Sequence, residues 1–169
     1  YVPVRDTRFG IEKNINVAAI AAKKAENVSE HVQVGTVNKM EEQAPVWVPA
    51  QIQPRHVDIQ AAADLLNSGQ KVALLVGQGA RHAQEQVVAV AEKLGAAITT
   101  SLLGKPYVDE SLPLAAGVMG HLGTSASGFA LANCDTLLII GSNDPWTEFY
   151  PPPGAARAVQ IDSDSAAIG

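Results

Sequence analysis

The sequence predicts an α/β domain, a Rossmann-like three-layer sandwich built on a parallel sheet. Residues 72–76 are apolar at every position, which is typical of a parallel strand covered on both faces. Further strand-like segments follow at 96–100, 136–140 and 157–161. Helix-forming segments lie among them, and this alternation favours a parallel sheet with right-handed crossovers.

Three segments predict helices that would cover this sheet. We expect Asp58 to cap the first helix and Thr124 the third, while Gly69 and Gly95 end the first and second. The second helix runs from about residue 81 to residue 94. The expected apolar faces consist of Ile59, Ala62, Ala63 and Leu66 in the first helix, Val87, Ala91 and Leu94 in the second, and Ala126, Phe129 and Ala130 in the third.

Composition separates the chain into two parts and excludes several classes of protein. Residues 1–56 are interpreted as an N-terminal arm or linker, or as the tail of a preceding domain, and residues 57–169 as the domain itself. A net charge of −5 argues against a nucleic-acid partner, and no apolar run is long enough to span a membrane. The single cysteine excludes an internal disulfide. The chain starts with Tyr1 and without a signal peptide, so we expect a piece of a longer, cytoplasmic protein.

Ligands of open parallel sheets bind at the carboxyl ends of the strands, so the loops there are the candidate site. Gly77, Gln78 and Gly79 follow the first strand, and the glycines would let a ligand approach the backbone in front of a helix N-terminus. The third glycine of the dinucleotide fingerprint would fall at His82 and is absent. A nucleotide loop and a tight turn are equally good interpretations of this segment.

Three further loops add polar and glycine residues to the same edge. A glycine-rich loop at 117–123 precedes the third helix, and we interpret its His121 as a polar loop residue rather than a catalytic one. Small polar residues and Trp146 follow the third strand, where they suit a ribose or a ring. Asp162 follows the last strand and either binds ribose hydroxyls or caps a turn. The candidate cofactor-binding residues are Gly77, Gln78, Gly79, Met119, Gly120, His121, Leu122, Ser142, Asn143, Asp144, Pro145, Trp146 and Asp162.

Other polar residues carry weaker hypotheses. Lys105 is either a phosphate contact or a solvated lysine, and Cys134 is expected to be an inert buried thiol. The histidines do not have the spacing of metal ligands. We therefore predict neither a catalytic residue nor a metal site within this chain.

Taken together, these loops resemble the central domain of the pyruvate oxidase and acetolactate synthase family of thiamine-diphosphate enzymes. The resemblance covers about residues 59–169 and is greatest to the quinone-linked pyruvate oxidases, through residues 148–151 and 161–169. It implies that this domain holds FAD, with contacts at 119–122, 142–146 and 162. The thiamine-diphosphate motif of the family, Gly-Asp-Gly followed by a distant Asn, is absent from the sequence. The resemblance therefore implies that thiamine diphosphate and magnesium lie in flanking domains, and that full-length chains form a tetramer.

Two alternatives stay open at this point. The domain could be a regulatory module that binds ADP or coenzyme A, or a structural middle domain with an empty site, as in decarboxylases of the same family. In each case the chain is not catalytic by itself.

Overall fold

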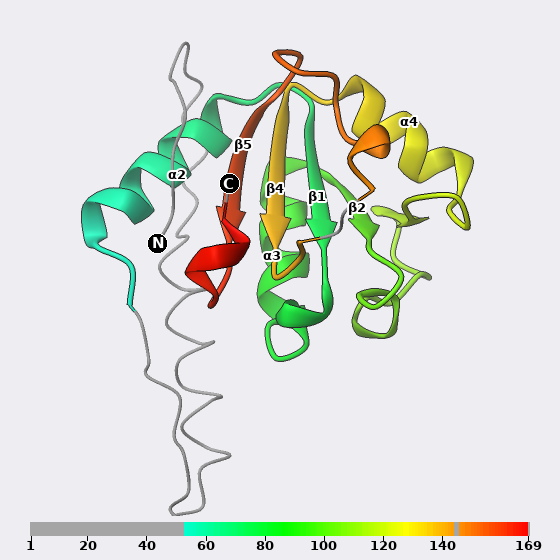
Figure 1. Ribbon diagram of the computed structural model, residues 1–169, viewed down its shortest axis with the longest axis horizontal. Helices are drawn as coiled ribbons and strands as arrows, with labels where there is room; N and C mark the ends of the chain where they lie inside the picture. The colour runs from blue at the N-terminus through cyan, green and yellow to red at the C-terminus, as the bar shows by residue number, and fades with distance from the viewer. Residues whose placement is uncertain (1–52, 144–145, 169) are drawn as a thin grey trace, which may run out of the picture.

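The computed structural model describes residues 53–143 and 146–168, which fold as a three-layer α/β/α sandwich (Figure 1). Its helices are α2 (His56–Ser68), α3 (Gln84–Leu94) and α4 (Ser125–Asn133). Its strands are β1 (Val72–Val76), β2 (Ala97–Thr100), β3 (Ala115–Val118), β4 (Thr136–Ile140) and β5 (Arg157–Ile161). Short 3-10 helices follow β1, β2, β4 and β5, namely η1 (Gln78–Ala80), η2 (Lys105–Tyr107), η3 (Thr147–Phe149) and η4 (Ser165–Ala167). The expected arm at 1–56 lies almost wholly outside the described residues.

The sheet is parallel throughout, as predicted, in the order β3-β2-β1-β4-β5. The central strands β1 and β4 are buried at every position, which is why β1 is apolar throughout and β4 is apolar after its first residue, Thr136. Helices α2 and α3 cover one face, where Leu74 and Leu138 are fully buried. Helix α4 covers the other face, against Leu75 and Leu137. All strands therefore end on the same side of the domain, at the bottom of Figure 1. We call this side the carboxyl edge of the sheet.

Most of the predicted helix signals are confirmed. The side chain of Thr124 accepts a hydrogen bond from the Ser127 amide at 3.1 Å and so caps α4. Gly95 ends α3 in the left-handed conformation, with φ of 60°. The predicted apolar faces of α2 and α3 are buried or packed against the core.

Four expectations about the elements were wrong. Strand β3 was interpreted as loop because its Ala-Ala-Gly-Val sequence lacks a strong strand pattern. Helix α2 begins before Asp58, whose carboxylate instead forms an ion pair with Arg55 in the first turn. Helix α3 begins at Gln84 and not at residue 81, since η1 occupies the preceding turn. Helix α4 buries Ser127 and Leu131, and it leaves the expected face residue Phe129 72% exposed.

Candidate functional site

The predicted site residues lie in four loops at the carboxyl edge of the sheet (Figure 1). These loops follow β1, β3, β4 and β5, so the parallel topology brings together segments that are far apart in the sequence. Asp144 and Pro145 lie outside the described residues. The other predicted residues are described loop by loop below.

The Gly77–Gly79 turn packs directly on the loop after β4. The Gly77 amide donates to the Ile140 carbonyl and the Gly79 amide to the Gly141 carbonyl, both at 2.9 Å. A Cβ atom at Gly77 would lie 2.2 Å from the Gly141 carbonyl oxygen, and one at Gly79 would lie 2.7 Å from the Gly141 Cα. The glycines are therefore required for contact between two backbones, which supports the tight-turn interpretation of this segment.

The helix that was expected directly behind this turn is displaced. Arg81 and His82 lie between η1 and α3, are both exposed, and the Arg81 Nε donates to the His82 Nε2 at 3.1 Å. The N-terminus of α3 therefore lies several residues beyond Gly79. The part of the nucleotide hypothesis that relied on this terminus for anion binding loses its support.

The loop after β3 exposes its backbone at Gly120. This residue has φ of 94°, and a Cβ atom there would have no neighbour within 4 Å. Met119, which precedes it, is buried, and its amide donates to the Thr100 carbonyl at 2.8 Å. Leu122 is 80% exposed. A ligand could thus reach the backbone at Gly120 without displacing a side chain.

His121 joins this loop to the segment after β4. Its Nε2 lies 3.3 Å from a carboxylate oxygen of Glu148. Its ring makes edge-on contacts with Phe149, at a centroid distance of 4.8 Å, and with Trp146, at 5.5 Å. In the sequence, Glu148 contributed to the family resemblance but was not a candidate site residue, and the segment containing Phe149 was interpreted as a packing feature.

Ser142 is buried at the same edge, and its hydroxyl has no hydrogen-bond partner in the described part of the chain. Its Cβ lies 2.6 Å from the position that a Cβ of Gly77 would occupy, so the residue sits against the β1 turn. Its carbonyl accepts a hydrogen bond of 3.4 Å from Gln160. The neighbouring Asn143 is exposed. Among the described residues, the carboxyl end of the sheet therefore holds a buried donor without an acceptor at Ser142, and a second one at the Thr100 hydroxyl, where β2 ends.

Asp162 has a structural partner. One of its carboxylate oxygens accepts a hydrogen bond from the Asp164 amide at 2.9 Å, which is the turn-capping role considered for it in the sequence. The Gly141 amide next to it donates to the Ile161 carbonyl at 2.8 Å, so the ends of β4 and β5 are joined.

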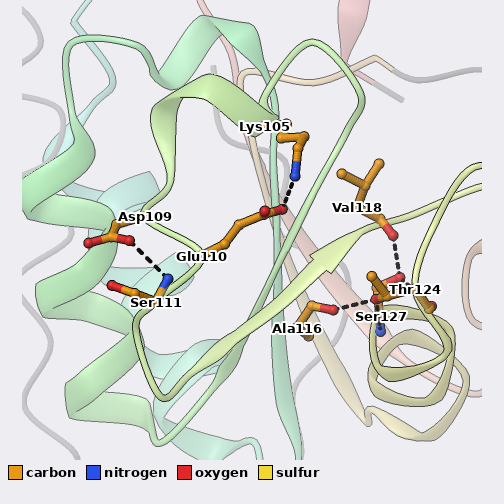
Figure 2. A network of polar contacts seen from close by, with 8 residues as sticks. All are labelled: Lys105, Asp109, Glu110, Ser111, Ala116, Val118, Thr124 and Ser127. Carbon is orange, nitrogen blue, oxygen red and sulfur yellow. Dashed lines mark hydrogen bonds and ion pairs between the residues drawn. The ribbon is translucent and has the colours of Figure 1, made fainter.

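A hollow of about 430 Å³ lies beside the edge strand β3 and was not predicted. Its walls come from β3 itself and from the loops after β2 and β3. Figure 2 shows the polar contacts around it. Lys105, a possible phosphate contact in the sequence, forms an ion pair with Glu110 on one wall. The Thr124 hydroxyl donates to the Ala116 carbonyl and the Ser127 hydroxyl to the Val118 carbonyl, so side chains satisfy the free edge of β3.

Two observations limit the chemistry of the described residues. Cys134 is buried, and burial together with the neighbouring Asp135 raises the pKa of its thiol to about 11, as expected of an inert cysteine. Within 53–143 and 146–168, no group of His, Cys, Asp and Glu side chains could hold a metal ion.

No helix in these ranges is long and apolar enough to cross a membrane.

A family model confirms the resemblance at the level of the domain. The model of the thiamine pyrophosphate enzyme central domain matches residues 59–169, about two-thirds of the chain. The chain belongs to this family. The matched residues begin within α2.

Curated relatives of this central domain include proteins with several activities. The chain is 34% identical over 123 residues to the acetolactate synthase large subunit of Parasynechococcus marenigrum, covering 69% of the chain and 20% of that protein. It is 30% identical over 125 residues to the sulfoacetaldehyde acetyltransferase of Alcaligenes xylosoxydans xylosoxydans, covering 66% and 20%. An uncharacterized 42.6 kDa protein of Pseudomonas amyloderamosa is 40% identical over 114 residues, covering 68% and 28%. The chain thus spans less than a third of the length of these relatives.

The fold of the central domain also matches a solved structure. An X-ray structure of a protein from Mycobacterium smegmatis, assigned there to the thiamin diphosphate-dependent enzymes, aligns with a TM-score of 0.58 at 22% identity. The alignment covers 76% of this chain and 26% of that one. At this identity the likeness establishes the Rossmann-like fold and nothing further.

Proposed function

We propose that this central domain binds FAD at the carboxyl edge of its sheet, within a longer thiamine-diphosphate enzyme that acts on pyruvate or another 2-oxo acid. The observation that carries the proposal is the buried Ser142 hydroxyl, which lacks a partner among the described residues and lies against the Gly77 turn. Leaving a buried hydroxyl unpaired costs about 1–3 kcal/mol. A phosphate or ribose oxygen of a bound nucleotide would supply the missing acceptor.

The loop after β3 supports the same placement. Gly120 offers an open backbone at positive φ, and the neighbouring His121 and Trp146 are exposed aromatic groups at the rim. Such groups suit the ring system of a flavin or an adenine. The residues that would hold the nucleotide are Gly120, His121, Ser142 and Asn143. The backbone amides of Gly77, Gly79 and Met119 and the carboxylate of Asp162 are bonded within the protein, so these four residues would line the site rather than bind through those groups.

Assignment to the pyruvate oxidase branch rests on the resemblance at 148–151 and 161–169, since the relatives described above include a synthase and a transferase. In the whole enzyme, bound FAD would accept electrons, and thiamine diphosphate with magnesium would act in the flanking domains. This domain would bind and orient the flavin, and full-length chains would assemble as a tetramer.

Titration of the purified chain with FAD, followed by flavin absorbance and fluorescence, tests the proposal. We expect saturable binding and a raised melting temperature, since a ligand at 100 times its Kd stabilises a protein by about 2.7 kcal/mol. ADP is titrated in parallel and in competition. Binding of ADP without FAD would replace the proposal with a regulatory nucleotide module, and a melting temperature insensitive to both would indicate a purely structural domain.

A further inference from the structure

Backbone hydrogen bonds hold the loop after β3 on both sides of His121. The Met119 amide is bonded to the Thr100 carbonyl on the side nearer β3. On the α4 side, the Gly123 amide donates to the Gly120 carbonyl at 2.8 Å and the Thr124 amide to the Val118 carbonyl at 2.9 Å. Gly120 itself has nothing near its Cβ position. Gly120 contributes its carbonyl to these bonds, while its amide takes part in none of them, so the amide is the group that could meet a nucleotide.

The side chain of His121 supplies contacts with the rest of the domain at this point. Glu148 lies 3.3 Å from its Nε2, and Phe149 lies edge-on to its ring at 4.8 Å with an interplanar angle of 89°. Phe149 is partly buried and packs against the core on the α4 face of the sheet. Its position is thus fixed independently of the loop. Contact with Phe149 and Glu148 restricts where His121, and with it Gly120, can lie.

We propose that Glu148 and Phe149 are positioning residues for the nucleotide site, which hold His121 so that the Gly120 backbone is presented in one conformation. This rests on the proposed function of the domain. Neither residue is required to touch the ligand. Order in the loop before binding reduces the entropy lost when the nucleotide binds, so the contacts raise affinity.

The negative charge of Glu148 allows its positioning role to be distinguished from a direct electrostatic effect on the ligand. FAD carries a pyrophosphate, and the chain has a net charge of −5. A carboxylate near the site repels an anionic ligand. From this repulsion alone, removing the carboxylate should strengthen binding of the anion. Positioning through His121 predicts the opposite sign, because Glu148→Gln loosens the loop. The two effects therefore make opposite predictions for the same variant.

The first measurement needs no nucleotide. Amide hydrogen exchange of residues 119–124 is compared in the parent chain, Glu148→Gln and Phe149→Leu, which keeps an apolar side chain in the core. We expect the Gly123 and Thr124 amides to exchange about two- to fivefold faster in both variants, the range that corresponds to one exposed polar contact for Glu148→Gln and to one aromatic contact for Phe149→Leu. Unchanged exchange would overturn the proposal even in a chain that binds no nucleotide, so its failure is distinguishable from failure of the FAD assignment.

The second measurement is the Kd for FAD, with Glu92→Gln as the matched control. Glu92 is an exposed residue near the end of α3, at the opposite edge of the sheet, and its substitution changes the net charge by the same amount. We expect Glu148→Gln and Phe149→Leu to raise the Kd about two- to fivefold, through loss of a polar and an aromatic contact respectively, and Glu92→Gln to leave it unchanged or lower it slightly. A higher Kd in Glu148→Gln with unaltered exchange would mean that Glu148 contacts the nucleotide directly, which overturns the positioning role.

Discussion

Gly79 and Gly141 lie in backbone contact, with the Gly79 amide donating to the Gly141 carbonyl at 2.9 Å. The ends of β1 and β4 can approach this closely only because neither residue carries a side chain. A Cβ atom at Gly79 would lie 2.7 Å from the Gly141 Cα, and backbone cannot move aside as a flexible side chain can. The contact fixes the loop after β1 against the loop after β4, which contains Ser142.

Gly79→Ala should therefore destabilise the domain by about 1–3 kcal/mol, the usual range for overpacking. Urea unfolding followed by circular dichroism measures this. Gly128→Ala is the matched control, because Gly128 lies within α4 and its Cβ would meet nothing within 4 Å. It should stabilise the domain by about 0.5–1 kcal/mol, since alanine is the better helix former. Equal effects of the two substitutions would contradict the role of the Gly79–Gly141 contact.

Thr124→Val should destabilise the domain through two hydrogen bonds at once. The hydroxyl accepts from the Ser127 amide as the cap of α4 and donates to the Ala116 carbonyl on the edge of β3. Valine keeps the shape and removes both bonds, so we expect a loss of about 1–2 kcal/mol in the free energy of unfolding. Ser125→Ala, at the exposed next position, should change it by less than about 0.5 kcal/mol. A Thr124→Val chain as stable as the parent would show that water replaces these bonds.

The strands at 72–76 and 136–140 could be predicted because burial on both faces leaves every residue apolar in the first strand and every residue after Thr136 apolar in the second. Strand β3 could not, because its small residues are held by neighbours rather than by propensity. The Thr124 and Ser127 hydroxyls that satisfy its edge belong to the next helix. Local sequence patterns do not reveal hydrogen bonds between residues of different secondary-structure elements.

The candidate site was predictable in its location but not in its contacts. Topology alone places the loops around Gly77, Gly120 and Ser142 at one edge of the sheet. The pairing of His121 with Glu148 depends on how two loops from different strands fold back on each other. For Gly77 and Gly79, the glycine signal was correctly noticed, but the structure explains it by contact between loops.

Cys134 should resist thiol reagents in the folded domain. Burial and the nearby Asp135 raise the pKa of its thiol from 9.0 to about 11, so little of the reactive thiolate is present at neutral pH. Reaction with a chromogenic disulfide at about pH 8 should be slow in the native protein and fast in denaturant. Fast labelling of the native chain would contradict the burial of this side chain.

The same shift predicts a dependence of stability on pH. The folded-state pKa lies above the unfolded one, so the contribution of Cys134 to stability is complete below pH 9 and is lost as the pH rises towards about 11. The difference in unfolding free energy between the parent and Cys134→Ala should therefore shrink over this interval. Subtracting the variant removes the effects of other titrating groups, and a constant difference would argue against the shift.

Ser142→Ala should affect stability and binding in opposite directions. The Ser142 hydroxyl is buried without a partner, so its removal should leave the free energy of unfolding unchanged or raise it. Ser127 is the matched control, because its buried hydroxyl donates to the Val118 carbonyl, and Ser127→Ala should cost about 0.5–1.5 kcal/mol.

The two variants should also differ in their affinity for FAD, and here Ser142→Ala should be the more affected one. If the nucleotide accepts a hydrogen bond from Ser142, Ser142→Ala should raise the Kd about two- to tenfold, corresponding to the net value of one hydrogen bond. Flavin fluorescence titration of the two variants at one temperature measures this. A Ser142→Ala chain that binds FAD as tightly as the parent would show that this hydroxyl does not contact the nucleotide, and it would remove the observation on which the flavin assignment rests.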